Sequence, residues 1–229
     1  MERMDKCLGF GGLGDCFIII LKLLEYDKPF IYTHIDISAK RLKLSMELLD
    51  MFGIQHDCKV VSNIKEWWYD HNGEYYKCFN VFAKGHIHIP HRPYHWQPCI
   101  DEGLHNPFAQ IIPTKTNHVA VQVNSGGGRN HKEKPVVEYV MANYNESQIL
   151  WFGTDKGFKS EYGTNYCGKL DFISALARMA SCKYFVGFPS VLLYNALYTK
   201  TQCYLFTDHQ GKEDLRIHDE WKKLLTYDI

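Results

Sequence analysis

The stretch that decides the fold is Gly9–Cys16, with the sequence GFGGLGDC. Gly9, Gly11 and Gly14 have the spacing G-x-G-x-x-G, and Asp36 follows roughly twenty residues later. This combination is typical of a fold in which a strand turns into a helix whose N-terminus holds a pyrophosphate. It predicts an α/β fold and leaves open whether the loop binds NAD or has another role.

Strand-like and helix-like segments alternate on both sides of this loop. The expected order is strand Lys6–Gly9, helix Asp15–Glu25, strand Phe30–Ile37, helix Ala39–Gly53, strand Cys58–Ser62, and a helix or long connection over Asn63–Tyr76. A chain that alternates in this way forms a parallel sheet.

The pattern changes between Lys84 and Pro113, where five prolines and five histidines occur without sustained periodicity. Alternation then resumes with strand His118–Val123, a glycine-rich loop, helix Lys134–Tyr144, strand Gln148–Gly153, helix Asp171–Cys182, strand Lys183–Phe188, helix Ser190–Thr199, strand Gln202–Phe206 and a last helix from about Asp214 to Leu225. We therefore expect two small Rossmann-like domains with parallel sheets facing a central cleft. The first covers residues 1–112, with 84–112 as a crossing segment, and the second covers residues 113–229 with a terminal helix packing back.

Composition limits the classes of protein that fit. The 229 residues contain 26 Lys and Arg against 26 Asp and Glu, so no global charge favours nucleic acid or an anionic membrane, although a local patch stays possible. The eight cysteines are scattered without a C-x-x-C pair, which favours reduced thiols over disulfides. No apolar run is long enough to span a bilayer, so we expect a soluble, cytoplasmic protein without a membrane span.

A second glycine-rich loop lies in NSGGGRNHKEKP, residues Asn124–Pro135. Consecutive glycines let backbone N–H groups approach a ligand, and the following helix directs its positive end at the loop. Five residues of the loop would form an anion cradle, namely Ser125, Gly126, Gly127, Arg129 and Lys132. The alternative is a flexible, basic surface turn, and the loop does not match the Walker pattern.

From about Val119 to Phe206 the sequence resembles the heptosyltransferase-type glycosyltransferases, the ADP-heptose:lipopolysaccharide family of GT-B fold. The resemblance lies in the loop ending in Lys132 and Pro135, in ILWFGTD, in GKLDFISALARMASCKYFVG and in VGFPSVLLYNALYTKTQCYLF. In the first half, GGLGDCFIIILKLL is similar to the glycine-rich loop and apolar helix that begin these enzymes. The chain is compact compared with the usual members.

The resemblance implies a role for each matching residue. Asp15 falls on the proposed catalytic base, and its alternative role is to cap the helix. The donor nucleotide sugar would contact Gly12, Gly14, Ser125, Gly126, Gly127, Arg129, Lys132, Gly153, Thr154, Leu170, Ser190 and Tyr194. This chain departs from the family pattern where Pro189-Ser190-Val191 replaces Asp-Ser-Gly and where Tyr194 replaces a histidine. These departures leave open whether the chain uses the same donor as the family.

The crossing segment allows three interpretations. Arg92, Tyr94 and Trp96 are candidates for acceptor binding, because such side chains stack on and pair with a base or a sugar. Four histidines with H-x-H spacing are a weaker metal hypothesis, and they are His86, His88, His91 and His95. The prediction is that the protein needs no metal and no cofactor, and that the segment is mainly a connector.

Three functions remain open from the sequence. The first is a metal-independent glycosyltransferase that moves a sugar from a nucleotide-diphosphate donor to a glycan, or to a modified DNA base if the compact chain is a phage or viral enzyme in a host cytoplasm. The second is an NAD-type oxidoreductase that uses the first glycine loop and Asp36. The third is a binding module for nucleotide sugars that has lost catalysis, as Pro189 and Tyr194 suggest. The donor, the acceptor and the oligomeric state are not specified.

Overall fold

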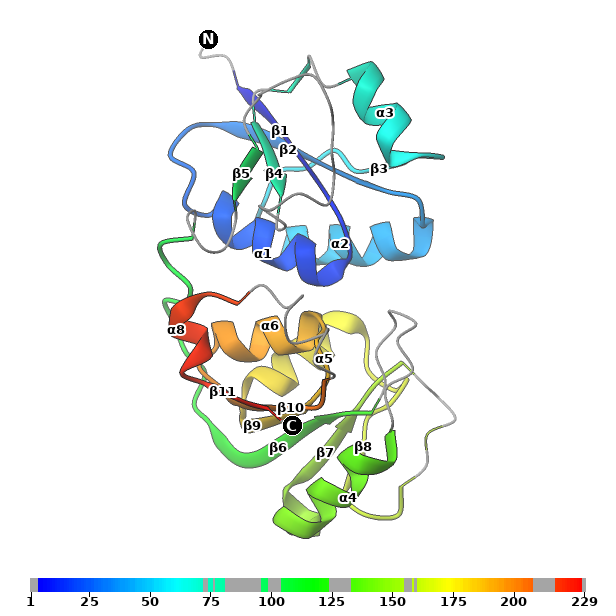
Figure 1. The fold of residues 1–229 in the computed structure, drawn as a ribbon, viewed down its shortest axis with the longest axis vertical. Helices are drawn as coiled ribbons and strands as arrows, with labels where there is room; N and C mark the ends of the chain where they lie inside the picture. The colour runs from blue at the N-terminus through cyan, green and yellow to red at the C-terminus, as the bar shows by residue number, and fades with distance from the viewer. Residues whose placement is uncertain are drawn as a thin grey trace. The chain divides into compact units, whose positions relative to one another are not determined.

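The computed structural model describes residues 4–71, 74–75, 77–80, 96–98, 104–123, 133–154, 158, 160–207 and 217–227. The chain divides into two compact units, Met1–Asn106 and Pro107–Ile229 (Figure 1). The division falls inside the Pro-rich segment, in which the sequence analysis placed its boundary after residue 112.

The first unit contains a five-stranded parallel sheet with the order β3-β2-β1-β4-β5. Its strands are β1 (Asp5–Phe10), β2 (Phe30–Asp36), β3 (Lys59–Val60), β4 (Lys77–Asn80) and β5 (Trp96–Pro98), and its helices are α1 (Leu13–Leu23), α2 (Ala39–Met51) and α3 (Ile64–His71). Helices α1 and α2 pack side by side (Figure 1). The sequence-based prediction of a β-α-β-α-β order with parallel strands is confirmed for this unit.

Local sequence explains why α1 and α2 form where they do. Every residue of α1 from Cys16 to Leu23 is buried, as expected of a helix that is apolar on all sides. Ser38 is the N-cap of α2, and its Oγ accepts the backbone N–H of Arg41 at 3.3 Å. It ends before Gly53, which has a φ of +67° and so provides the left-handed turn that closes many helices.

The second unit contains a six-stranded parallel sheet with the order β11-β10-β9-β6-β7-β8. Its strands are β6 (Thr116–Gln122), β7 (Ile149–Phe152), β8 (Thr164–Asn165), β9 (Cys182–Gly187), β10 (Gln202–Leu205) and β11 (Leu225–Tyr227). Its helices are α4 (Glu133–Asn143), the 3-10 turn η2 (Glu146–Gln148), α5 (Phe172–Ala180), α6 (Val191–Tyr198) and α8 (Asp219–Lys222). Both sheets are therefore doubly wound, with the strand order reversing next to the first strand of each unit.

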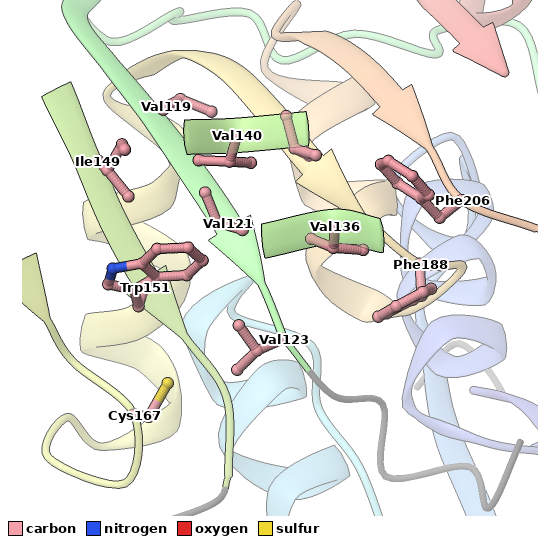
Figure 2. Packing of buried hydrophobic residues seen from close by; sticks show 11 residues of the cluster. Val119, Val121, Val123, Val136, Val140, Ile149, Trp151, Cys167, Phe188 and Phe206 are labelled. Carbon is pink, nitrogen blue, oxygen red and sulfur yellow. The ribbon is translucent and has the colours of Figure 1, made fainter. Parts of the chain in front are cut away.

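One hydrophobic cluster of the second unit lies between α4 and the sheet (Figure 2). Val136 and Val140 of α4 pack on the apolar residues of β6, and the fully buried Trp151 of β7 lies beside them. The cluster consists of Val119, Val121, Val123, Val136, Val140, Ile149, Trp151, Cys167, Val186, Phe188 and Phe206. Continuous apolar strands of this kind are typical of parallel sheets that are covered on both faces.

The segment that leads out of the first unit is fixed to α1 by a buried ion pair. Glu25 Oε1 accepts the backbone N–H groups of His105 and Asn106 at 2.7 Å and 2.6 Å, and Glu25 Oε2 accepts a hydrogen bond from Lys22 Nζ at 3.1 Å. Both charged side chains are only 9% exposed. Burial strengthens these charge-assisted hydrogen bonds relative to the same contacts in water.

The next residues are fixed within the second unit. The indole N–H of Trp221 donates to the carbonyl of Pro107 at 2.7 Å, and the side chain of Trp221 is fully buried. The backbone N–H of Ala109 donates to the carbonyl of Tyr198 at 2.9 Å. Asn106 is thus held by contacts within the first unit, and Pro107 by contacts within the second.

The structure corrects two expectations from the sequence. The Pro- and His-rich crossing contains a strand, because Trp96–Pro98 pairs in parallel with β4. The expected last helix is present only as α8 in the described residues, and Leu225 begins β11, which pairs in parallel with β10. The physical reason is that the backbone of β10 needs hydrogen-bond partners along its outer side, and the chain from Leu225 to Tyr227 supplies them.

Seven cysteines lie in the described part of the chain, and no disulfide joins any two of them there. Six of them are buried, and Cys58 is half-buried. Cys99 lies outside the described residues. Over the described ranges, none of the helices combines the length and the apolar character that a membrane crossing requires.

Candidate functional site

The topology marks one place in each unit where a ligand is expected. In doubly wound sheets, ligands bind beyond the carboxyl ends of the strands, where the strand order reverses. In the first unit this point lies between β1 and β4, and in the second it lies between β6 and β9. The glycine loop Gly11–Gly14 follows β1, and the residues that follow β9 include Ser190.

The glycines of the first loop have structural reasons to be glycine. Gly9 lies inside β1, and a Cβ atom there would stand 2.2 Å from the hydroxyl oxygen of Tyr32. Gly11 has a φ of +130°, and a Cβ atom there would stand 2.5 Å from Asp15 Oδ2. The loop is therefore shaped around the Asp15 carboxylate.

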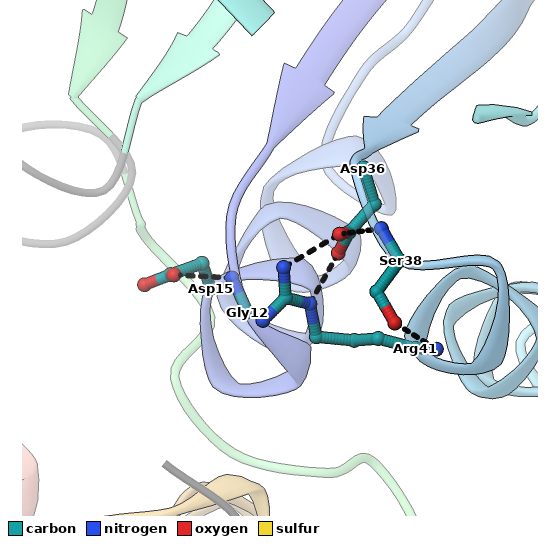
Figure 3. Close-up of polar contacts among 5 residues, drawn as sticks. All are labelled: Gly12, Asp15, Asp36, Ser38 and Arg41. Carbon is teal, nitrogen blue, oxygen red and sulfur yellow. Dashed lines mark hydrogen bonds and ion pairs between the residues drawn. The ribbon is translucent and has the colours of Figure 1, made fainter. Parts of the chain in front are cut away.

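Asp15 occupies the first turn of α1. Its Oδ2 accepts the backbone N–H of Gly12 at 2.7 Å (Figure 3). Among the described residues no hydrogen bond reaches its other oxygen, Oδ1. Burial raises the pKa of this carboxyl group, while the Gly12 N–H and the charge of Arg41 act in the opposite direction. Asp15 therefore caps its helix and also presents one carboxylate oxygen.

Asp36 lies at the carboxyl end of β2 and is fully buried. Its two oxygens accept hydrogen bonds from Nε and a terminal nitrogen of Arg41, and Oδ1 also accepts the Ser38 N–H at 2.8 Å (Figure 3). Both oxygens are thus engaged within the protein, which gives no support to Asp36 as a ribose ligand of NAD. Arg41 was not singled out from the sequence. The signal that could have found it is Ser38, a typical N-cap residue, which places Arg41 in the first turn of the helix that follows Asp36.

A neutral histidine lies in β2, two residues before Asp36. His34 is fully buried, and its Nδ1 makes a 2.8 Å hydrogen bond with the hydroxyl of Tyr32. Burial lowers the pKa of His34 to about 4, and the nearby Asp36 carboxylate opposes this effect. His34 therefore carries no charge at neutral pH.

The switch point of the second unit joins Gln122 of β6 to Ser190. Ser190 Oγ donates to Gln122 Oε1 at 2.6 Å, and it accepts the backbone N–H of Leu193 at 3.4 Å as the N-cap of α6. A Cβ atom on Gly187 would stand 2.7 Å from Cβ of Gln122, so this glycine allows β9 to approach β6. Sequence reasoning identified Ser190 but missed Gln122.

Gly153, Thr154 and Leu170 follow the carboxyl ends of β7 and β8. The carbonyl of Gly153 accepts the backbone N–H of Gly168 at 2.9 Å, which ties the two connections together. Thr154 is exposed, and Leu170 is half-buried immediately before Asp171, the N-cap of α5. These predicted donor-binding residues therefore share the edge of the sheet on which Ser190 lies.

Tyr194 differs from the other predicted donor-binding residues. It is only 9% exposed in α6, and its ring centroid lies 6.2 Å from that of Trp221. Its ring packs within the second unit, and this packing explains the burial of Tyr194 without any contact to a ligand.

Several predicted residues lie outside the described part of the chain. They are Ser125, Gly126, Gly127, Arg129 and Lys132 of the second loop, Arg92 and Tyr94 of the crossing, and the histidines His86, His88, His91 and His95. Only the backbone of Trp96 is described. Within the described ranges, no three His, Cys, Asp or Glu side chains are grouped as a metal would require.

Comparison with known proteins gives a likeness in structure alone. No protein-family model matches the chain, and no curated protein matches its sequence. Among solved structures, E. coli ADP-heptose LPS heptosyltransferase II superposes with a TM-score of 0.55 at 12% identity, covering 97% of this chain and 90% of that one. The fold is that of the GT-B heptosyltransferases.

Two further heptosyltransferase structures have this fold. E. coli WaaC, solved with ADP, gives a TM-score of 0.51 at 12% identity over 97% of this chain and 92% of WaaC. TibC of enterotoxigenic E. coli, a dodecameric iron-containing heptosyltransferase solved with ADP-D-beta-D-heptose, gives 0.53 at 11% identity. That match covers all of this chain and 64% of TibC, so the chain spans less than two thirds of TibC.

Proposed function

We propose that this protein is a glycosyltransferase that moves a sugar from a nucleotide-diphosphate donor to an acceptor hydroxyl. The observation that carries the proposal is the Asp15 carboxylate, which stands at the switch point of one Rossmann-like unit with Oδ1 free of partners among the described residues. The heptosyltransferase fold supports it, because those enzymes have two such units.

In the proposed reaction Asp15 is the general base. An oxygen of the acceptor hydroxyl forms a bond to the anomeric carbon, and its proton passes to the Asp15 carboxylate. The bond between the anomeric carbon and the diphosphate oxygen breaks, and its electron pair leaves with the nucleoside diphosphate. Fixed N–H groups and cations stabilise the charge that develops on this leaving group, so the mechanism needs no metal.

The second unit is the proposed donor side. Ser125, Gly126, Gly127, Arg129 and Lys132 would hold the diphosphate, and Gly153, Thr154 and Leu170 would line the nucleotide. Ser190 would act from the N-terminus of α6, where its hydroxyl is fixed by Gln122. In the first unit, Gly12 and Gly14 let the backbone approach the sugar, and Arg92, Tyr94 and Trp96 are the candidates for the acceptor.

The proposal is tested by Asp15→Asn. We expect a loss of roughly 10²- to 10⁴-fold in transfer, because the amide cannot accept the proton, while nucleotide binding stays unchanged. Turnover is followed by release of nucleoside diphosphate from mixed nucleotide sugars, with glycans and hydroxymethylated DNA as acceptors. Calorimetry with ADP and other nucleoside diphosphates measures binding.

A matched control is Asp70→Asn, which removes an exposed carboxylate from α3. Normal turnover in Asp15→Asn would remove Asp15 from the mechanism. Thermal stabilisation of the chain by NAD, and none by nucleoside diphosphates, would favour the oxidoreductase hypothesis instead.

One observation favours a second candidate, a non-catalytic nucleotide-sugar-binding module. Ser190 is fixed by Gln122, and Tyr194, which stands at the position of the family histidine, is packed against Trp221. A chain of this kind would bind a nucleoside diphosphate by calorimetry and would release none from any nucleotide sugar in the same assay.

A further inference from the structure

Three charged groups from three different elements gather around the glycine loop. They are Asp15 of α1, Asp36 of β2 and Arg41 of α2 (Figure 3). The proposed reaction uses only Asp15, so the other two need an explanation. Asp36 is fully buried, which is costly for a carboxylate unless it is paired.

Asp36 fixes the position of Arg41. Two nitrogens of the guanidinium donate to the two carboxylate oxygens, a planar arrangement that holds the side chain far better than a single contact. The Ser38 N–H donates to the same carboxylate, and Ser38 Oγ caps the helix that carries Arg41. The side chain of Arg41 nevertheless remains 43% exposed. Ile35 of β2 pairs with Phe10 of β1, so Asp36 and its partner Arg41 lie next to the start of the glycine loop at Gly11.

Arg41 acts on Asp15 through space and not through a hydrogen bond. Figure 3 draws the Arg41–Asp36 ion pair and the Gly12–Asp15 hydrogen bond in one close-up, with no hydrogen bond between Arg41 and Asp15. Burial raises the pKa of the Asp15 carboxyl group, and the positive charge of Arg41 acts in the opposite direction. The three side chains together carry a net charge of −1, which opposes the binding of an anion at this point. Arg41 is therefore not placed to bind a phosphate group of the donor or of the acceptor.

Two further titratable groups of the described residues lie near Asp15, and burial disfavours the charged form of each. His34 of β2 has a pKa of about 4 because it is buried. Burial also raises the pKa of the Cys16 thiol, the next residue of α1, above its usual range. The remaining interaction is the Gly12 N–H of the loop itself. Of these groups, Arg41 is the one whose charge favours the ionised form of Asp15.

We propose that Arg41 is a positioning residue, which Asp36 holds beside the glycine loop so that its positive charge favours the carboxylate form of Asp15, the form that takes the proton of the acceptor hydroxyl. This inference rests on the proposed function. It assigns Asp36 to the support of Arg41 and assigns no substrate contact to either residue.

The first experiment measures Asp15 directly and needs no substrate. The ¹³C carboxyl shift of Asp15 is titrated by NMR in the full chain, with Asp15→Asn used to assign the signal. We expect the midpoint to move to higher pH in Arg41→Gln, to return most of the way in Arg41→Lys, and to stay in place in Lys43→Gln, which removes an exposed charge from the same helix. An unchanged midpoint in Arg41→Gln would overturn the proposal.

The second experiment follows the pH profile of donor turnover in the same variants. The acidic limb of kcat/KM should move to higher pH in Arg41→Gln, with a loss of about threefold to tenfold on that side of the profile and full recovery at alkaline pH. A uniform loss at every pH would indicate a merely structural role and contradict the proposal. If Arg41→Gln fails to fold, it is combined with Asp36→Asn, and the double variant is compared with Asp36→Asn alone. Both variants lack the Asp36 charge, so loss of the Arg41 charge should still shift the midpoint upward between them.

The two experiments separate the two proposals. The Asp15 midpoint could shift in Arg41→Gln while the wild type turns over no nucleotide sugar. That result would support the coupling of Arg41 to Asp15 and contradict the transferase function. Turnover that is lost in Asp15→Asn, together with an unshifted midpoint in Arg41→Gln, would keep the transferase and reject the role of Arg41.

Discussion

His34 is a buried base whose proton affinity differs between the folded and the unfolded chain. Its folded pKa of about 4 lies below the ordinary value of 6.5. A group with a lowered pKa stabilises the fold fully above the ordinary value, and this contribution is lost as the pH falls toward the folded value. Stability should therefore decline between about pH 6.5 and pH 4 by at most about 3 kcal/mol from this residue.

The prediction is checked by urea unfolding of the wild type and of His34→Leu at several pH values in this range. The variant should be less stable at neutral pH, because it loses the hydrogen bond to Tyr32, but its stability should depend less steeply on pH. His105→Gln is the matched control, since it removes an exposed histidine and leaves His34 in place. Equal slopes in wild type and His34→Leu would show that His34 titrates normally.

At the scale of the residue, contacts between residues close in the sequence could be predicted, and contacts between distant residues could not. The loop motif pointed to Asp15 and Gly12, and the structure joins them by a hydrogen bond between residues three apart. Gln122 and Ser190 are separated by 68 residues, so their contact depends on which strands become neighbours. Arg41 was missed because the dinucleotide motif already assigned Asp36 a role as ribose ligand, so no partner for its carboxylate was sought.

Strands β1 and β2 pack so closely that one position has no room for a methyl group. The Gly9 Cβ position would lie 2.2 Å from the hydroxyl oxygen of Tyr32 and 3.0 Å from Cδ1 of Ile19. Gly9→Ala should therefore destabilise the fold by about 1–3 kcal/mol, the usual effect of overpacking. The measurement is the free energy of unfolding in urea.

A double-mutant cycle identifies the cause. Tyr32→Phe removes the nearest oxygen, so Gly9→Ala should cost less in that background than in the wild type, although contacts with the ring and with Ile19 remain. The same cost in both backgrounds would mean that the strain arises elsewhere than between β1 and β2.

At the scale of the element, apolar periodicity identified the long helices and the central strands. It failed for β8 and β11, because a strand of two or three residues is too short to display a period. The strand β11 forms because β10 offers it backbone partners, and this pairing information is absent from the local sequence. The predicted helices Lys134–Tyr144 and Ala39–Gly53 correspond to α4 (Glu133–Asn143) and α2 (Ala39–Met51), with bounds that differ by one or two residues.

In the molecule as a whole, Glu25 and Trp221 hold successive residues of the connection, each within its own unit. Glu25→Ala should speed hydrogen exchange at the amides of His105 and Asn106 on the order of tenfold, because both lose their acceptor. The exchange is measured by NMR or mass spectrometry.

The reciprocal control is Trp221→Phe, which keeps an aromatic ring and loses the indole donor. It should leave exchange at His105 and Asn106 unchanged, since its partner is the carbonyl of Pro107. Acceleration of the same amides in Trp221→Phe would mean that the two supports are coupled.

The alternation of helices and strands predicted two units with parallel sheets, and the structure confirms this class of fold. The order of strands in each sheet could not be derived from the same pattern, because alternation fixes the direction of strands but not which neighbours they choose. The identity of the acceptor and donor depends on loops and not on the fold, so neither could be derived from it.

The supports on either side of the Asn106–Pro107 bond restrict the backbone of these two residues. Asn106 is held through its backbone N–H by Glu25, and Pro107 is held through its carbonyl by Trp221, each within its own unit. The proline ring holds its own φ near about −65° and keeps the preceding residue out of the helical region. The backbone at this point therefore has little conformational entropy left to lose.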